Sequence, residues 1–302
     1  MKKTNIPGAE GASVYDITTL FFKGVKDIRL SERAAAMSFN FLMAIPPSLI
    51  FLFSLVPYLP LDTVETTILN SIRLLSPNER LFNSVQGIVT DFMQTKRREL
   101  LSLGFLFTLF VSSNGVMGLL RGFDRDSPAH VKRTGMARRK KAILLTLGLM
   151  MVLLVSIALL IIQTSVLDKY LADLAGNASV LKMISGLTLV GIIYITMCIL
   201  YKYGPSLEDK FRFFSPGAFL ATVLFVGVSY LFFYIANHFI NYNKVYGSIG
   251  TLLMFMAWMF ITGMVILIGF ELNLSIMMHH KLAAAARDKN RHPPEQPAGQ
   301  VN

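Results

Sequence analysis

Cysteine, histidine and charge are all scarce in this sequence. Cys198 is the only cysteine among 302 residues, so neither an internal disulfide framework nor a thiol cluster for a metal is available. The five histidines form no H-x-H or H-E-x-x-H arrangement, and only 16% of the residues are charged. Apolar residues are abundant instead: 53% of the chain is hydrophobic and the mean hydropathy is +0.54. This composition excludes an ordinary soluble domain of the same size.

Six segments are long and apolar enough to cross the hydrocarbon core of a bilayer, which takes roughly 20 apolar residues in a helix. The alternative for each is a buried helix of a large soluble core. Such helices are normally shorter and carry a polar stripe, which residues 142–163 lack. We therefore predict an all-α, polytopic membrane protein with six transmembrane helices. The predicted spans are residues 34–58, 100–120, 142–163, 183–201, 216–240 and 249–271.

Basic residues are distributed unevenly among the segments outside these spans. Of the 29 lysines and arginines, 21 lie in the N-terminal segment, the 121–141 and 202–215 loops and the C-terminal tail. The positive-inside rule then predicts that both termini are cytoplasmic. This topology, together with contact with anionic lipid headgroups, accounts for the net charge of +11 better than a nucleic-acid footprint does.

Three segments outside the spans have patterns of their own. Apolar residues at helical spacing from Val14 to Ile28 predict an amphipathic helix on the inner membrane surface. The exterior loop carries two apolar stripes separated by a capping sequence at Ser76, which predicts a helical hairpin over the outer face. The Pro-rich tail is predicted to be disordered. The predicted division is a cytoplasmic N-terminus 1–33, a membrane domain 34–285 with the exterior loop 60–99, and a tail 286–302.

Several short motifs carry a resemblance to a known family. They are the PGA at residues 216–218, the YGS at 246–248, Trp258, the G-x-E-x-N at 269–273 and the segment "SSNGVMGLLRGFDRD" from Ser112. Together they resemble the YihY/BrkB family of bacterial inner-membrane proteins over roughly residues 15–285. The resemblance implies a six-span helical bundle in the bacterial cytoplasmic membrane. Labels given to family members include a ribonuclease, a serum-resistance virulence factor and a participant in envelope lipid or lipopolysaccharide traffic.

Ribonuclease chemistry has little support in the residues. Phosphodiester hydrolysis at neutral pH takes metal-bound carboxylates and histidines, or a histidine acid/base pair, facing water. His279 and His280 are sequence neighbours at the end of a span, where adjacent residues point to different helix faces. The "VSSNG" segment lacks the strand-turn-helix context of a nucleophile elbow. We therefore expect no enzymatic activity, no metal site and no cofactor.

Glu271 is the only acidic residue within the six predicted spans. Arg33 and Arg121 lie toward the same side of the membrane, so either could pair with this carboxylate and lock the sixth span to a neighbour. The alternative is a cytoplasm-facing cavity that binds a polar headgroup or carries a proton. Asn40 shares a helix face with Arg33, and Asn114 shares one with Arg121, so all five residues are candidates for a polar interior cleft.

Other residues of the spans have predicted structural roles. Asn273 lies about 200° around the helix from Glu271 and continues a stripe with Thr262 and Gly269 that suits close helix packing. Pro46 and Pro47 fall within the first span, where they are predicted to kink or break the helix.

The fifth span carries a polar stripe at helical spacing that extends through its outer half. Its members are Tyr230, Tyr234, Asn237 and Asn241. Interhelical hydrogen bonds with an interfacial aromatic belt are one interpretation of this stripe, and the lining of an outward pathway is the other.

These features favour a protein that binds or moves amphipathic envelope lipids, or that supports envelope lipid transport. An exporter or channel for small solutes or ions is the first alternative, and a structural membrane partner of a periplasmic complex is the second. Lipid ranks first because an ion route would need repeated charged groups within the membrane, where Glu271 is the only acidic residue. The expected partners are membrane lipids and periplasmic or envelope transport proteins, without nucleic acid.

Overall fold

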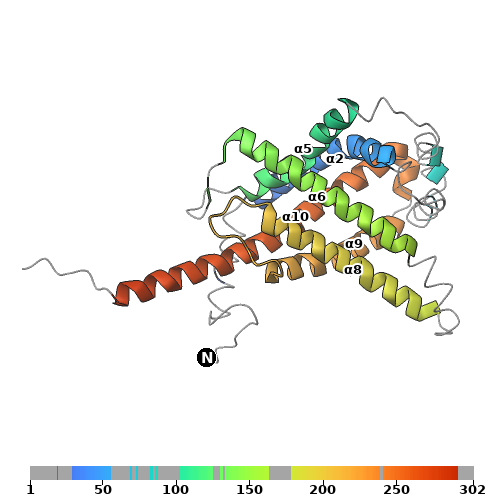
Figure 1. Ribbon diagram of the computed structural model, residues 1–302. Helices are drawn as coiled ribbons and strands as arrows, with labels where there is room; N and C mark the ends of the chain where they lie inside the picture. Colours follow the sequence, from blue (N-terminus) through green and yellow to red (C-terminus); the bar gives the residue numbers. More distant parts are fainter. Residues whose placement is uncertain are drawn as a thin grey trace, which may run out of the picture.

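A computed structural model describes residues 29–55, 103–124, 130–131, 133–162, 178–238 and 241–291, with a few single positions between residues 19 and 87. In this part of the chain the regular structure is helical, apart from an isolated antiparallel bridge between His130 and Leu207. Figure 1 shows long helices packed side by side, with the end of the last helix projecting from the bundle. The helices are α2 (Leu30–Leu55), α5 (Leu103–Phe123), α6 (Gly135–Ile162), α8 (Ala178–Tyr203), α9 (Pro216–His238) and α10 (Asn241–Arg291).

Five of these helices are long and apolar enough to cross a membrane. Within the windows that qualify in α8 and α9, only 17% of the residues are buried inside the protein. Apolar helices with such exposed faces are expected where lipid, rather than more protein, covers them. The prediction of an all-α, polytopic membrane protein is therefore confirmed. The qualifying windows are Leu106–Phe123, Gly135–Leu159, Met183–Tyr203, Pro216–Ile235 and Leu252–Lys281.

The helices form a closed ring in which each packs on the next. The order around the ring is α2, α10, α9, α8, α6 and α5, and α5 packs on α2. Glycines of α5 allow the close approach of α2. A Cβ atom added at Gly115 would lie 2.9 Å from the Cβ of Ala44, and one at Gly118 would lie 2.6 Å from the Cβ of Asn40. Small residues at a membrane helix interface let two backbones come together in this way.

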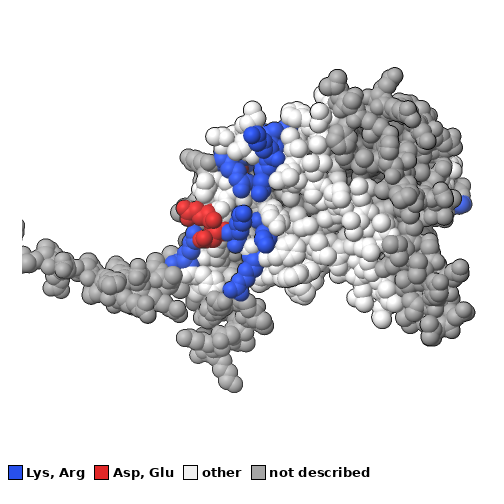
Figure 2. Space-filling view, viewed as in Figure 1, with Lys and Arg blue, Asp and Glu red and all other residues white. Residues whose placement is uncertain are grey.

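Buried side chains concentrate where α5 and α8 end and where α2, α6 and α9 begin. Phe123 packs there against Phe270, with ring centroids 4.8 Å apart, and against Tyr201 at 6.0 Å. Lysines and arginines gather on the surface of this same end of the molecule (Figure 2). We call it the basic end.

The structure differs from the predicted elements in two places. α10 continues to Arg291, past residue 286 where a disordered tail was predicted to begin, because Leu, Ala, Arg and Lys, which are good helix formers, make up most of the sequence after Lys281. α2 is a continuous helix through Pro46 and Pro47, so of the two predicted effects the break is absent, whereas the kink stays a prediction. Membrane helices tolerate proline more readily than soluble ones. Most of the N-terminal segment and of the 60–99 loop, and residues 292–302, lie outside the described residues.

Candidate functional site

Arg33 connects three helices at the basic end. Its Nη1 lies 3.4 Å from Oε1 of Glu271, whose side chain is 1% exposed. Its Nε donates a hydrogen bond of 2.8 Å to the carbonyl oxygen of Gly122, and Nη2 donates to the same oxygen. Arg33 is thus the arginine that pairs with Glu271, while Arg121 is exposed on α5. Pairing removes the cost of an isolated charge among apolar helices and ties α2 to α5 and α10.

The other polar groups proposed for an interior cleft make separate contacts. Asn114 accepts a hydrogen bond of 2.7 Å from Nη1 of Arg139, which joins α5 to α6. The Arg139 guanidinium also lies over the ring of Phe110, 3.5 Å from its centroid. Asn40 donates to the carbonyl of Ala36 on its own helix at 2.7 Å. The structure therefore spreads these groups over several helix contacts and does not collect them around Glu271.

The described side chains of the polar stripe are those of Tyr230 and Tyr234 on α9, and they lie on the outside of the bundle. Tyr230 is 76% exposed and Tyr234 is 54% exposed, so both rings face outward and do not line a space between helices. The side chains of Asn237 and Asn241 lie outside the described part of the protein.

The packing stripe on α10 meets the start of α9. Asn273 Oδ1 accepts a hydrogen bond of 2.8 Å from the Gly217 amide, and its Nδ2 donates to Ser215 Oγ at 2.9 Å. A Cβ atom on Gly269 would lie 2.7 Å from the Cβ of Ala221, and Thr262, further along the stripe, is partly buried. The PGA motif and the G-x-E-x-N motif are thus two sides of one tight contact.

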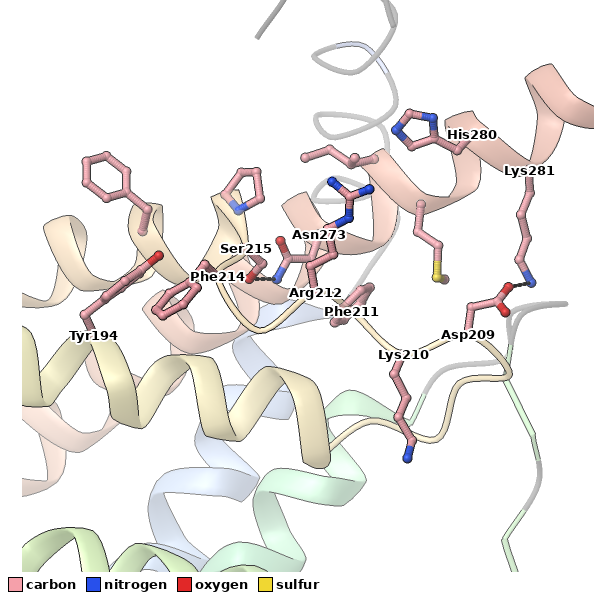
Figure 3. Close-up of a pocket in the computed structure, with 14 residues that line it drawn as sticks. Tyr194, Asp209, Lys210, Phe211, Arg212, Phe214, Ser215, Asn273, His280 and Lys281 are labelled. Carbon is pink, nitrogen blue, oxygen red and sulfur yellow. Dashed lines mark hydrogen bonds and ion pairs between the residues drawn. The ribbon is translucent and has the colours of Figure 1, made fainter. Parts of the chain in front are cut away.

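A pocket of about 710 Å³ opens at the basic end, between the end of α8, the loop that follows it, the start of α9 and α10 (Figure 3). Its apolar walls include Tyr194 and Phe214, whose rings stack with centroids 6.0 Å apart. The remaining lining residues are Asp209, Lys210, Phe211, Arg212, Ser215, Pro216, Phe219, Asn273, Ile276, Met277, His280 and Lys281.

Sequence reasoning missed this pocket and assigned Asn273 to packing alone. The signal that could have found it is the run "DKFRFFSP" at residues 209–216, in which cations alternate with aromatic residues beside a span end.

Charged groups surround the mouth of the pocket. Lys281 Nζ lies 2.7 Å from Oδ2 of Asp209 and 3.4 Å from Oε2 of Glu208, so α10 is joined to the loop by ion pairs. Arg212 is exposed beside them. Among the described residues, no group of three or more histidine, cysteine, aspartate or glutamate side chains is placed to hold a metal ion.

The start of α9 does not offer open donors to a ligand. Pro216 has no amide proton, the Gly217 amide donates to Asn273, and the Ala218 amide donates to Ser215 Oγ at 3.3 Å. A charged ligand in the pocket would therefore meet the side chains at its mouth, not the end of this helix.

Comparison with known proteins identifies the family. The family model for virulence factor BrkB matches residues 21–296, which is most of the chain. The chain belongs to the BrkB family. It is 28% identical over 255 residues to the ribonuclease-like protein YfkH of Bacillus subtilis, covering 83% of this chain and 91% of that protein. No solved structure matches the chain.

Several other relatives are named only as membrane proteins. A UPF0761 membrane protein of Haemophilus influenzae is 23% identical over 271 residues, which is 86% of this chain and 94% of that protein. The membrane protein YihY of Shigella boydii matches over a shorter region, 27% identical across 32% of this chain and 33% of its own length. These matches agree with the resemblance predicted from the motifs, and the chain is an integral membrane protein of the YihY/BrkB family.

Proposed function

We propose that this protein binds amphipathic envelope lipids in the pocket at its basic end, and that this end faces the cytoplasm. The observation that carries the proposal is the joining of two chemistries in one cavity of about 710 Å³. Aromatic and aliphatic walls from Phe214, Phe219 and Ile276 meet charged side chains such as Arg212 and Lys281. An amphipathic molecule needs both environments side by side.

The size and position of the pocket suit part of a lipid. Ligand cavities usually measure roughly 300 to 1,000 Å³, so this one can hold a headgroup and the first carbons of its chains while the rest stays in hydrocarbon. Phe219 supports lateral access, because it lines the pocket and is also 64% exposed on the outer face of α9.

The chemistry at the pocket favours holding a molecule over cleaving it. The amide side chain in the pocket, that of Asn273, is hydrogen-bonded to the start of α9. The carboxylate in the pocket, that of Asp209, forms an ion pair with Lys281. We infer a non-enzymatic role in which the protein moves such lipids itself or supports periplasmic and envelope transport proteins that do. The word ribonuclease-like is part of the name of YfkH, and we do not extend that activity to this protein.

Photocrosslinking in living cells tests this proposal. A photoreactive residue at Ile276 would sample the pocket, and one at Phe233, which is 53% exposed on the outer surface of α9, would sample bulk lipid. We expect lipid adducts at both positions, with anionic lipids enriched at 276 relative to 233. Identical lipid composition at the two positions would overturn the proposal, as would small-solute flux in proteoliposomes without any lipid adduct at 276.

A further inference from the structure

The loop after α8 is fastened to the segment before α6. Arg133 donates from Nη1 to the Gly204 carbonyl at 3.2 Å and from Nη2 to the Pro205 carbonyl at 2.9 Å. The Val131 amide donates to the Ser206 carbonyl at 2.9 Å, and Ser206 Oγ donates back to the carbonyl of Val131. These bonds fix the end of α8 against the start of α6, so side chains from both helices keep defined relative positions.

Two lysine side chains approach the same tyrosine ring at this junction. Lys141 Nζ lies 5.8 Å from the centroid of the Tyr203 ring, and Lys202 Nζ lies 5.7 Å from the same centroid. The charges of Arg133 and Lys210 also act on Lys141. Figure 3 shows the Lys210 side chain extending from the loop away from His280 and Arg212. We call Arg133, Lys141, Lys202 and Lys210 the cation cluster.

The cluster lacks acidic partners within the described ranges, where none of its four side chains lies within ion-pair distance of a carboxylate. The acids in the neighbouring loop, Glu208 and Asp209, are bound by Lys281 instead. Arg133, Lys141 and Lys202 are partly buried, which reduces the screening of their mutual repulsion by solvent. The Tyr203 ring attracts both neighbouring ammonium groups but brings no negative charge.

We propose that the cation cluster is a binding site for a phosphate group that carries more than one negative charge, presented by a lipid at the membrane surface. One such group would cancel the repulsion among several cations, whereas a singly charged phosphodiester would cancel less. A phosphomonoester carries a charge of about −1.5 to −2 at pH 7, so it offsets a larger part of the positive charge of the cluster than a phosphodiester does. Tyr203, which is 40% exposed at the end of α8, would lie beside the glycerol group and the first acyl carbons of the bound lipid.

Three of the four residues of this site lie apart from the pocket, and Lys210 is shared with it. Phe213 lies on the cluster side of the loop, with Lys202 Nζ 5.5 Å from its ring centroid, whereas Phe214 lines the pocket. Lys210 borders both. The inference therefore holds whatever occupies the pocket, and it names a more specific headgroup than the proposed function does.

Native mass spectrometry of the full chain in detergent tests the inference, with phosphatidate, phosphatidylglycerol and phosphatidylcholine of identical acyl chains as probes. We expect wild type to retain phosphatidate at least tenfold better than phosphatidylglycerol, and Lys141→Gln/Lys202→Gln to lose this preference. Lys140→Gln, an exposed neighbour on α6, should keep it. Lys141→Arg/Lys202→Arg, which preserves both charges, should also keep it and so shows that charge decides the result.

Two further experiments distinguish this site from the pocket, and a lipid ligand from a soluble phosphate compound. Ile276→Trp narrows the pocket, so a preference for phosphatidate that vanishes in this variant would place the anion in the pocket and overturn a separate site. Inorganic pyrophosphate that displaces phosphatidate and binds as tightly would identify a free phosphate compound as the ligand and reject the lipid source. Equal retention of all three lipids by wild type would reject the site altogether, whatever photocrosslinking at 276 shows.

Discussion

Glu271 is a buried carboxylate that forms an ion pair with an arginine from the other end of the sequence. Its ion pair with Arg33 is 3.4 Å long and lies among apolar helices. Glu271→Gln keeps the shape of the side chain but leaves Arg33 without its counter-charge. We predict a loss of roughly 1 to 3 kcal/mol in the free energy of unfolding in detergent. Chemical or thermal unfolding of the purified variant measures this loss.

A double-mutant cycle identifies the partner. Because both changes break the same pair, Arg33→Met combined with Glu271→Gln should cost less than the sum of the two single changes. Arg33→Met alone should cost more than Glu271→Gln, since Arg33 also donates to the Gly122 carbonyl. Arg121→Met is the matched control on the exposed surface of α5, and its effect should add fully to that of Glu271→Gln. Additivity for the Arg33 pair would contradict the predicted coupling.

The sequence could show that Glu271 needs a basic partner but not every pairing that surrounds it. Acidic residues are scarce in the predicted spans, and a single carboxylate within an apolar span requires a cation nearby. Asn114 had no comparable signal. Its partner, Arg139, lies in a stretch with five other basic residues, at 132, 133, 138, 140 and 141, and spacing alone cannot choose among them.

At the scale of elements, α9 and α10 are held together by contact between backbones. A Cβ atom on Gly217 would overlap the Gly269 carbonyl oxygen and would lie 2.6 Å from the Asn273 side chain. Gly217→Ala should therefore destabilise the protein by about 1 to 3 kcal/mol, as overpacking of a tight contact does. Gly227→Ala, on the same helix with nothing within 4 Å, should be neutral or slightly stabilising. Equal unfolding midpoints for the two variants would show that this contact is looser than the structure indicates.

Element positions followed from the sequence because hydrophobic length is a local property. The stripe of Thr262, Gly269 and Asn273 was likewise predictable, since helical geometry fixes which residues share a face. The pocket was not predictable in this way. Its walls come from the end of α8, the loop and α10, and the loop is shaped by hydrogen bonds between distant segments, such as those from Arg133 to Gly204 and Pro205. No period in the sequence encodes such contacts.

At the scale of the whole molecule, the basic end contains the buried ion pair, the pocket and the cation cluster. The Arg33–Glu271 pair and the contact between Gly217 and Asn273 hold α2, α5, α9 and α10 together there. The pocket and the cluster lie on either side of the loop that joins α8 to α9. A rigid helical frame therefore positions two surfaces that could address lipid headgroups in the same leaflet.

The orientation of this frame in the membrane decides which leaflet those surfaces meet. Because 21 of the 29 lysines and arginines fall in segments assigned to one side, we predict that the basic end is cytoplasmic. In a Cys198→Ser background, Met136→Cys at the start of α6 should react with an impermeant maleimide in inverted membrane vesicles but not in right-side-out vesicles. Asn83→Cys, in the 60–99 loop, should react in the opposite preparation. Both substituted residues are exposed, with Met136 at 71%, so access to the reagent is limited by the membrane and not by burial.

Cys198→Ser alone supplies the background signal. Labelling of both cysteines in the same vesicles would contradict the topology, and the reverse pattern would place the pocket and the cation cluster at the outer leaflet.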